Sequence, residues 1–453
     1  MSSTPASRLE TFRDGSRICT HELQQAIDAA AAGSGILVLT PGTYRTGTLD
    51  LRSNLVLDLR PGATLQASDD LADYPATQGG HNKDRQPYHF LRLHRISNVV
   101  VRGGGRIDGA GSSFWHPEPV AGGWLREKGP RPSPMIHCHN SQDIRFDSIE
   151  IANSPGWTLH LQCCDRVWVR GVAIRNHLFG PNTDGIDIDG CRDVMVSDCR
   201  IEAGDDAVVI KTCPDSRSCE RVTVTNCSIA TNCRALKLGA IESYHAMRSI
   251  VFSNCTVEQS VALVGLYCRN GGDLEDIAVS NITGRAFSNP DFNQPIHIDL
   301  ARAPGNDAGP RGSIRNVVID NVVCRSNGRV LLTAEEGSLV ENVMLRGVLF
   351  QPENVFDPAP GGAAARGNQF SPRTPEARAA RAAFVAQNLR HLRIESCAVH
   401  WPDTLPALFH GFWGRGLRGG SIDGAGLDAS GPGIESVLLE QCEGTRVHVG
   451  RQG

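Results

Sequence analysis

The sequence lacks a long hydrophobic run, an excess of positive charge and much aromatic character. No apolar stretch in its 453 residues approaches the roughly 20 that a membrane-spanning helix needs. Its first eight residues contain no apolar segment typical of a signal peptide, so the chain as given is expected to be cytoplasmic, or secreted or periplasmic if a leader was removed. A net charge of −4 gives no basic surface, so neither nucleic acid nor membrane is an expected partner.

Metal-binding cysteine motifs are missing as well. The chain has 15 cysteines but no two CxxC pairs, and Cys163-Cys164 with His160 nearby falls short of a four-ligand zinc site. One position in the sequence alternates between cysteine and aliphatic residues: Cys199, Cys227, Cys255, Ile282 and Val322. We therefore expect buried, reduced cysteines and a reducing compartment, with no metal and no cofactor.

A short phrase of a polar residue followed by alternating strand formers recurs through the chain. Its lead apolar positions are 144, 167, 194, 222, 250 and 277, separated by 23, 27, 28, 28 and 27 residues. A fixed period of this size predicts a solenoid, and the two-residue alternation predicts β-strands. An Asx residue ends the phrase in successive copies, which predicts a ladder of tight turns: Asp198, Asn226, Asn254, Asn281 and Asn321.

A second strand follows the same period. It runs through Thr158–Leu161, Gly185–Ile188, Ala207–Ile210, Ala235–Leu238, Gly265–Cys268 and Pro295–Ile298. Its second and fourth positions are apolar in every copy and are expected to face the interior, while the third faces outward. In this register Trp157, Asp184, Asp206 and Arg234 share one column, with neighbouring coils roughly 4.8 Å apart.

The two ends and two interruptions complete the predicted organisation. Residues 1–34 are expected to form an N-terminal segment with a capping helix from about His21 to Ala32, capped by Thr20 and ended by Gly33. Residues 35–453 are expected to form one all-β, right-handed parallel β-helix. Long loop insertions interrupt the pattern near 104–135 and 352–385, and loops of that length are usually functional or disordered.

Three carboxylates converge in the predicted coils. Asp184 belongs to one coil, Asp205 and Asp206 belong to the next, and Asp187 lies close by. Like charges at this spacing favour one proton held at a raised pKa. A protonated carboxyl beside an ionised one suits inverting glycoside hydrolysis, whereas a solvated or calcium-binding acidic turn is the alternative that the charges alone leave open.

Asn182-Thr183-Asp184 followed by Gly204-Asp205-Asp206 resembles the acidic signatures of glycoside hydrolase family 28, the polygalacturonases and rhamnogalacturonan hydrolases. Further stretches resemble the bacterial members of that family: Asp14-Gly15, Pro41–Tyr44, Pro61–Leu65 and Asn153–Thr158. The resemblance covers roughly residues 10 to 345 and implies a right-handed β-helix enzyme that cleaves pectin with inversion. It also implies that Asp205 is the general acid, and that Asp184 and Asp206 position and deprotonate the water.

Two motifs depart from the family pattern. Arg234-Ala235 stands where the family has His-Gly, and Tyr267-Cys268-Arg269 stands for its uronate-binding Arg-x-Lys. A fixed cation does not shuttle protons near neutrality, and the tyrosine offers an aromatic face in place of one cation. Besides the three aspartates, the expected substrate-binding residues are Asn182, Asp187, Arg234, Lys237, Tyr267, Arg269 and His297.

The sequence thus predicts a pectin-degrading glycosidase with an altered uronate subsite, and the two insertions favour exo action. A non-catalytic carbohydrate-binding β-helix, such as an adhesin or tailspike, and a calcium-dependent pectin lyase are the alternatives. An adhesin has no need of three converging aspartates. A lyase would need a basic residue beside a metal, and Arg234 is the one candidate that this register supplies.

Overall fold

The computed structural model describes residues 9–78, 82, 84–119, 123–288, 293–303, 305–306, 308–358 and 374–448. The chain divides into two compact units: unit 1 contains Met1–Val209 and Val222–Thr231, and unit 2 contains Ile210–Arg221 and Asn232–Gly453. One continuous β-helix over 35–453 stays a prediction. Among the described residues, no helix is long and apolar enough to cross a membrane.

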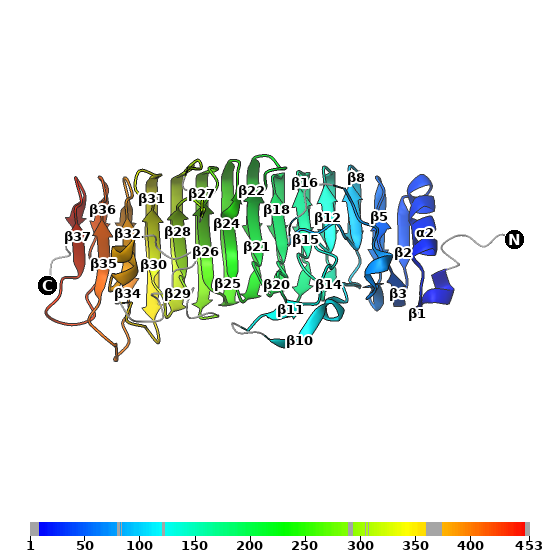
Figure 1. Cartoon of the computed structure of the whole chain (residues 1–453), viewed down its shortest axis with the longest axis horizontal. Helices are drawn as coiled ribbons and strands as arrows, with labels where there is room; N and C mark the ends of the chain where they lie inside the picture. Colours follow the sequence, from blue (N-terminus) through cyan, green and yellow to red (C-terminus); the bar gives the residue numbers. More distant parts are fainter. Residues whose placement is uncertain are drawn as a thin grey trace. The chain divides into compact units, whose positions relative to one another are not determined.

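Unit 1 is a stack of parallel coils, each opened by a strand of one sheet and closed by strands of a second (Figure 1). The opening strands are β4 (Leu49–Asp50), β7 (Leu91–His94), β12 (Ile136–His139), β15 (Leu159–Gln162) and β18 (Ile186–Asp189). The closing strands are β1 (Asp14–Ile18), β2 (Ile36–Leu39), β3 (Gly42–Thr46), β5 (Leu55–Leu59), β6 (Ala63–Ala67), β8 (Ser97–Arg102), β9 (Arg106–Asp108), β13 (Gln142–Asp147), β14 (Glu150–Ala152), β16 (Asp165–Arg170), β17 (Ala173–Arg175), β19 (Arg192–Ser197), β20 (Arg200–Ala203) and β23 (Ser228–Thr231).

Unit 2 repeats the arrangement, also with parallel pairing throughout its described strands. Its opening strands are β24 (Arg234–Ser243), β26 (Ala262–Cys268), β28 (Ile296–Leu300), β30 (Val330–Ala334), β32 (Ala382–Gln387), β35 (His410–Arg415) and β37 (Val437–Glu440). Its closing strands are β25 (Met247–Gln259), β27 (Asp273–Ala286), β29 (Ser313–Ser326), β31 (Leu339–Pro352), β33 (Arg393–Glu395), β34 (Ala398–Val399), β36 (Ser421–Asp423) and β38 (Arg446–His448). Two further strands, β21 (Val208–Thr212) and β22 (Cys219–Thr225), contain residues of both units.

The interior columns of the coils are those that the alternation predicts. Leu159 pairs with Ile186 and Leu161 pairs with Ile188, and all four side chains are fully buried. The third column was expected to face outward, and in unit 1 this outward position is not exposed, because His160 and Asp187 are fully buried too. The ring of His137 stacks on His160, and Asp189 pairs with His160. The alternation therefore predicts on which side of the strand a residue lies, but not whether that residue is exposed.

Helix α2 (Thr20–Ala32) lies against β2, β3, β4 and β5, and its buried face includes Leu23 and Ile27, as predicted. It ends at Gly33, also as predicted. The expectation that Thr20 caps it is wrong: Cys19 is the N-cap residue, without a side-chain hydrogen bond. The Thr20 hydroxyl instead accepts the Gly47 N–H at 2.8 Å, because the first coil lies close enough to supply a better-placed donor.

The Asx ladder is present as predicted, and thirteen of the fifteen cysteines are buried, while Cys163 and Cys442 are half-buried. All fifteen cysteines are free, and Cys255 pairs in register with Ile282, which pairs with Val322. The five Asx residues of the predicted ladder have φ between 51° and 58°. Within each unit, hydrogen bonds connect these side chains; for example, the Asn281 amide donates to the Asn254 side-chain oxygen at 2.9 Å.

The first insertion forms an antiparallel hairpin of β10 (Trp115–Pro119) and β11 (Leu125–Glu127), visible beside the coils of unit 1 in Figure 1. The Leu125 N–H donates to the Phe179 carbonyl at 2.8 Å, which attaches the hairpin to the coil before β18. In unit 2 the second insertion ends in α3 (Pro375–Ala379), which lies against β32. Parts of both insertions, residues 120–122 and 359–373, lie outside the described residues, as do residues 1–8 of the N-terminal segment.

Candidate active site

Asp184 is held by the turn that leads into β18. Asn182 has a φ of 51°, and its side-chain oxygen accepts from Arg131 at 3.1 Å. The buried Thr183 hydroxyl donates to the Gly180 carbonyl at 3.0 Å and accepts the Gly204 N–H at 3.0 Å. The Thr183 side chain therefore ties the turn before Asp184 to the turn before Asp205.

Gly204 permits the close approach of these two turns. A Cβ at this position would lie 2.4 Å from the Gly180 carbonyl oxygen and 2.5 Å from the Thr183 hydroxyl. The Gly204 carbonyl accepts from the indole of Trp124 at 3.0 Å, so the first insertion contacts the acidic motif directly.

Replacing Gly204 with alanine is expected to destabilise unit 1 by about 1–3 kcal/mol, because the added methyl group meets a backbone carbonyl that cannot move aside. Activity should fall together with stability, because Asp205 is the next residue and a shift of Gly204 would displace it. The control is Gly129→Ala, where a Cβ would meet nothing within 4 Å. Equal melting temperatures for the two variants would contradict the prediction.

The carboxylates come from neighbouring coils in the predicted register. The Thr158 N–H donates to the Asp184 carbonyl at 3.0 Å, and the Gly185 N–H donates to the Asp206 carbonyl at 2.9 Å. This repeated offset places Trp157, Asp184 and Asp206 in one column, as expected for unit 1. Asp184 and Asp206 are each 3% exposed, while Asp205 is half-buried.

Asp205 and Asp206 lie close to each other in space. A carboxylate oxygen of each lies within 4.8 Å of the other, and Asp205 Oδ1 accepts the Asp206 N–H at 2.9 Å. The Asp205 carbonyl accepts from the Thr231 hydroxyl. Such a pair of carboxylates can donate a proton, accept one, or supply two oxygen ligands to a cation.

A row of histidines adjoins Asp187, and sequence reasoning missed it. His137, His160 and Asp187 are in register on β12, β15 and β18, and the rings of His137 and His160 stack at 5.1 Å. His160 Nε2 lies 3.4 Å from Asp189. The signal was present, because His137 and His160 stand at equivalent points of two aligned phrases.

Burial makes His137 of this row sensitive to acid, together with His89 and His94, whose ring centroids lie 4.6 and 4.7 Å from that of His137. Burial lowers the pKa of His89 to about 3 and that of His94 to about 4, and it holds the pKa of His137 well below its usual value. His94 Nε2 and His137 Nδ1 are 3.0 Å apart, a hydrogen bond that needs one neutral acceptor. These groups therefore favour the neutral form in the folded chain.

The sign of the pH dependence follows. Below the unfolded pKa of about 6.5 the unfolded chain binds more protons than the folded chain, so the histidines' contribution to stability is present above that pH and is lost as the pH falls toward 4. We expect the melting temperature to fall between pH 7 and pH 5, where most carboxylates stay ionised. His94→Gln should reduce the slope. A flat profile for the unmodified chain would contradict this.

In unit 2 the expected substrate-binding side chains are all buried, and one was placed in the wrong register. Lys237 pairs with Gly265, which pairs with His297, whereas Tyr267 pairs with Gly239 and Asp299. The predicted column of Lys237, Tyr267 and His297 is therefore wrong by two residues at Tyr267. Strand β26 starts earlier than the alignment assumed, and a shift of two leaves the apolar alternation unchanged.

The Tyr267 ring nonetheless reaches that column by folding back over Gly265. A Cβ at Gly265 would lie 2.5 Å from the ring, and the Tyr267 hydroxyl is 3.2 Å from His297 Nδ1. The guanidinium carbons of Arg234 and Arg269 lie 5.7 and 5.8 Å from the ring centroid, within cation–π range. Tyr267 thus contacts both predicted cations.

Arg269 already has a carboxylate partner. Its Nη2 donates to Asp299 Oδ2 at 2.5 Å, and the Thr333 hydroxyl donates to Asp299 Oδ1 at 2.6 Å. Arg269 is 1% exposed. Asp299, which sequence reasoning missed, therefore compensates the charge that was expected to bind a uronate.

In unit 1 the clustered aspartates precede the opening strands of a parallel β-helix, an arrangement that suits the hydrolysis of glycosidic bonds. Residues 49–353 match the family model described as "Glycosyl hydrolases family 28", and the chain belongs to that family. The fold is accordingly the predicted all-β, right-handed parallel β-helix. The likeness to solved structures agrees with this.

Three similar proteins illustrate the match. A probable polygalacturonase of Vitis vinifera is 29% identical over 211 residues, covering 44% of this chain and 42% of that protein. A probable polygalacturonase of Arabidopsis thaliana is 23% identical over 278 residues, covering 58% and 59%. The family 28 exopolygalacturonase of Yersinia enterocolitica has a TM-score of 0.70 at 15% identity, covering 96% of this chain and 77% of that one, which shows the fold. The match thus spans about half the length of these two plant relatives.

Proposed function

We propose that the chain is a polygalacturonase-like glycosidase that hydrolyses pectic poly- or oligosaccharides of galacturonan or rhamnogalacturonan type with inversion. The observation that supports the proposal is that Asp184 and Asp206 occupy one column on neighbouring coils of a family 28 chain, with the carboxylate of Asp205 near that of Asp206. Pectin is the carbohydrate of plant cell walls on which polygalacturonases act. The partner is thus a pectic carbohydrate.

In this proposal Asp205 is the general acid. It is the more exposed member of the adjacent pair, so its proton can reach a leaving oxygen at the surface. Asp184 and Asp206, which share a column, position the water and remove its proton. Asn182, which is half-buried, contacts the substrate beside Asp184, whereas the fully buried Asp187 acts only through the residues that pack against it.

Product analysis on polygalacturonate tests the reaction. Hydrolysis yields reducing ends and no unsaturated sugar, and it persists in EDTA, whereas a calcium-dependent lyase yields an unsaturated product and stops. A carbohydrate-binding β-helix without catalysis yields neither product. Inversion is read from the anomer first formed in NMR. The anomer matters because one oxygen of Asp205 and one of Asp206 lie within 4.8 Å of each other, closer than the ~6.5–9.5 Å typical of inverting pairs.

The uronate subsite is proposed to be altered. In unit 2 Arg269 is paired with Asp299, and the ring of Tyr267 contacts Arg234 and Arg269. Arg269 is therefore committed to Asp299 rather than to a uronate, and the fully buried Tyr267 ring affects the subsite through the two arginines that it contacts. Lys237 and His297 border the same ring. This supports activity on an alternating backbone of both sugars.

Tyr267→Phe tests that specificity. It removes the hydroxyl that contacts His297 while keeping the ring, so we expect kcat/KM on rhamnogalacturonan oligomers to fall about tenfold or less, and activity on homogalacturonan oligomers to change little. Tyr267→Ala should reduce the first activity further. A strong preference for homogalacturonan that neither variant alters would remove this proposal.

We also infer exo action and a bacterial type. Exo action is supported by the hairpin of the first insertion, whose Trp124 contacts Gly204 beside the acidic pair. The bacterial type is supported by the motifs at Pro41–Tyr44 and Asn153–Thr158. Release of single sugars from the start of digestion, without an early fall in viscosity, is the outcome expected of exo action.

A further inference from the structure

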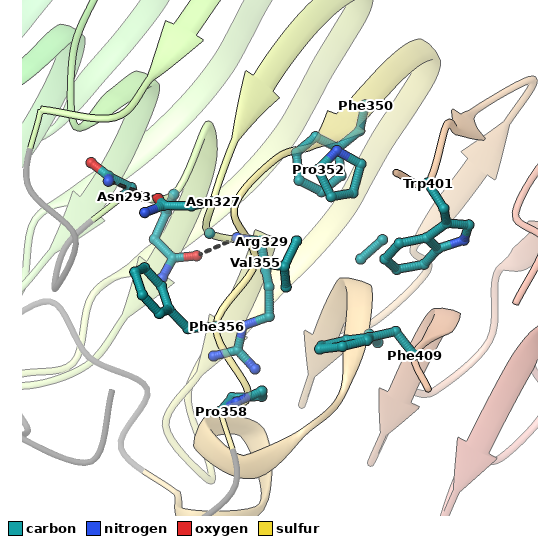
Figure 2. A pocket seen from close by; sticks show the side chains of 14 residues that line it. Asn293, Asn327, Arg329, Phe350, Pro352, Val355, Phe356, Pro358, Trp401 and Phe409 are labelled. Atoms are coloured by element: carbon teal, nitrogen blue, oxygen red, sulfur yellow. Dashed lines mark hydrogen bonds between the residues drawn. The ribbon is translucent and has the colours of Figure 1, made fainter. Parts of the chain in front are cut away.

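A pocket in unit 2 is built from residues that the proposed reaction does not use (Figure 2). It lies where the turns before β28, β30 and β35 meet the start of β32 and the end of β31. Its volume of about 60 Å³ holds several water molecules or one edge of a sugar ring. The residues that carry the argument are Asn293, Asn327, Arg329, Phe356, Trp401 and Phe409.

Arg329 is a cation without a counter-charge in this pocket. Its Nη1 donates to the carbonyls of Ala377 at 3.2 Å and Ala380 at 2.7 Å, and no carboxylate of a described residue pairs with it. The buried Arg269 of the same unit has a carboxylate partner, and so does the half-buried Arg302. Burial lowers the pKa of Arg329 to about 10, so it is still charged at neutral pH.

Half of the guanidinium fork is uncommitted. Its Nη2 and Nε make no hydrogen bond to any residue within the described ranges. A carboxylate binds a guanidinium through two parallel hydrogen bonds, which is the geometry that these nitrogens offer. Arg329 is half-buried, so its free nitrogens can be reached from the pocket, and an anion that replaces water there can complete the paired geometry.

Aromatic side chains line the pocket around this cation. Figure 2 shows the Arg329 side chain extending toward Pro358, with Phe356 on one side and Phe409 on the other. Phe356 is 48% exposed, so its ring is accessible to a ligand at the pocket. The ring of Trp401 lies 5.8 Å from that of Phe409, and its indole N–H is fixed by the Asp428 carbonyl at 2.7 Å.

An amide pair adds polar groups to the aromatic walls. The Asn293 amide donates to the Asn327 side-chain oxygen at 2.8 Å, and Figure 2 shows the two side chains together at one edge of the pocket. A pocket with one cation, two amides and several aromatic rings matches a ligand with a carboxylate, hydroxyls and an apolar C–H face. A uronic acid has all three.

We propose that this pocket binds a uronic acid residue, with its carboxylate on Arg329 and its ring against Phe356 and Trp401. The inference rests on the proposed function, because a pectic chain supplies the uronate. It would act as a carbohydrate-binding subsite whose residues are separate from the proposed catalytic ones. The competing interpretation is that Arg329 only caps the C-terminal carbonyls of α3. In that case the aromatic side chains have no effect on ligand binding.

The test measures the binding of galacturonate, galactose and inorganic phosphate to the full chain by ligand-detected NMR titration. Phe356→Ala and Arg329→Gln should each weaken galacturonate binding about tenfold, the loss expected for one charge-assisted contact or one stacked ring. Phe356 is exposed, so its variant keeps the fold even if the arginine variant does not. Leu408→Ala is the control, because Leu408 is 46% exposed and does not line the pocket.

Each outcome bears on the proposal. Galacturonate binding that Phe356→Ala leaves unchanged, or that Leu408→Ala weakens equally, overturns it. Phosphate or galactose binding as tightly as galacturonate overturns the uronate assignment. Binding should persist in Asp205→Asn, which leaves the pocket intact. If the chain binds galacturonate through Phe356 but does not hydrolyse pectin, the proposed function is wrong and the proposed binding site stands. If it hydrolyses pectin but shows no such binding, the proposed binding site is wrong and the proposed function stands.

Discussion

Replacing Asp205 with asparagine should lower kcat on pectic oligosaccharides by about 10²–10⁴-fold, the usual loss for a general acid. The amide keeps the shape of the side chain and can still accept the Asp206 N–H, which Asp205 accepts at 2.9 Å. It cannot donate a proton to the leaving oxygen at the required acidity. The melting temperature and the binding of substrate should therefore stay close to those of the unmodified chain.

The matched control is Asp198→Asn, a change of the same chemistry in the same unit. Asp198 is exposed and belongs to the Asx ladder, where its side chain accepts from Asn226 at 3.3 Å and where later copies carry asparagine. It should leave activity unchanged. An Asp205→Asn variant that cleaves a substrate with a poor leaving group at the unmodified rate would show that another residue is the acid.

The periodic features of this fold could be predicted because they repeat. The period near 27 residues, the interior columns containing Leu159 and Ile186, the Asx ladder and the buried cysteines each rest on several copies of one phrase. The column of Trp157, Asp184 and Asp206 follows from the same register. Repetition lets independent copies correct one another, so such features survive an error in any one coil.

The features that do not repeat were missed, for physical reasons that differ. Tyr267 was misplaced because a two-residue shift of β26 preserves the alternation on which the alignment depended. Thr183, Trp124 and Arg131 act on the acidic turns through long-range contacts that no local pattern encodes. Asp299 was missed for the same reason, since its role depends on Arg269 of the preceding coil.

The Arg269–Asp299 pair of unit 2 carries the largest stability effect that we expect. The guanidinium is 1% exposed, and Asp299 receives one hydrogen bond from it and another from Thr333. Removing one member of a buried pair leaves the other charge desolvated and uncompensated. Asp299→Ala should therefore lower the free energy of unfolding by about 3–5 kcal/mol.

The control is an exposed pair of the same residue types in the same unit. Arg346 and Asp320 also bridge neighbouring coils, at 2.7 Å, but their side chains are 53% and 31% exposed. Asp320→Ala should cost no more than about 1 kcal/mol, because water already solvates both charges. Chemical unfolding monitored by tryptophan fluorescence measures both variants. Equal losses would mean that burial does not govern the strength of the Arg269–Asp299 pair.

A double replacement separates the charge from the space that it occupies. Arg269→Met with Asp299→Leu removes both charges and keeps similar volume, so it should recover much of the stability that Asp299→Ala loses. The same variant tests the proposed subsite. If Arg269 contributes to substrate binding through Tyr267, the double variant should regain stability relative to Asp299→Ala but keep a KM above that of the unmodified chain. If Arg269 serves the fold alone, both the stability and the KM of the double variant should return toward the values of the unmodified chain.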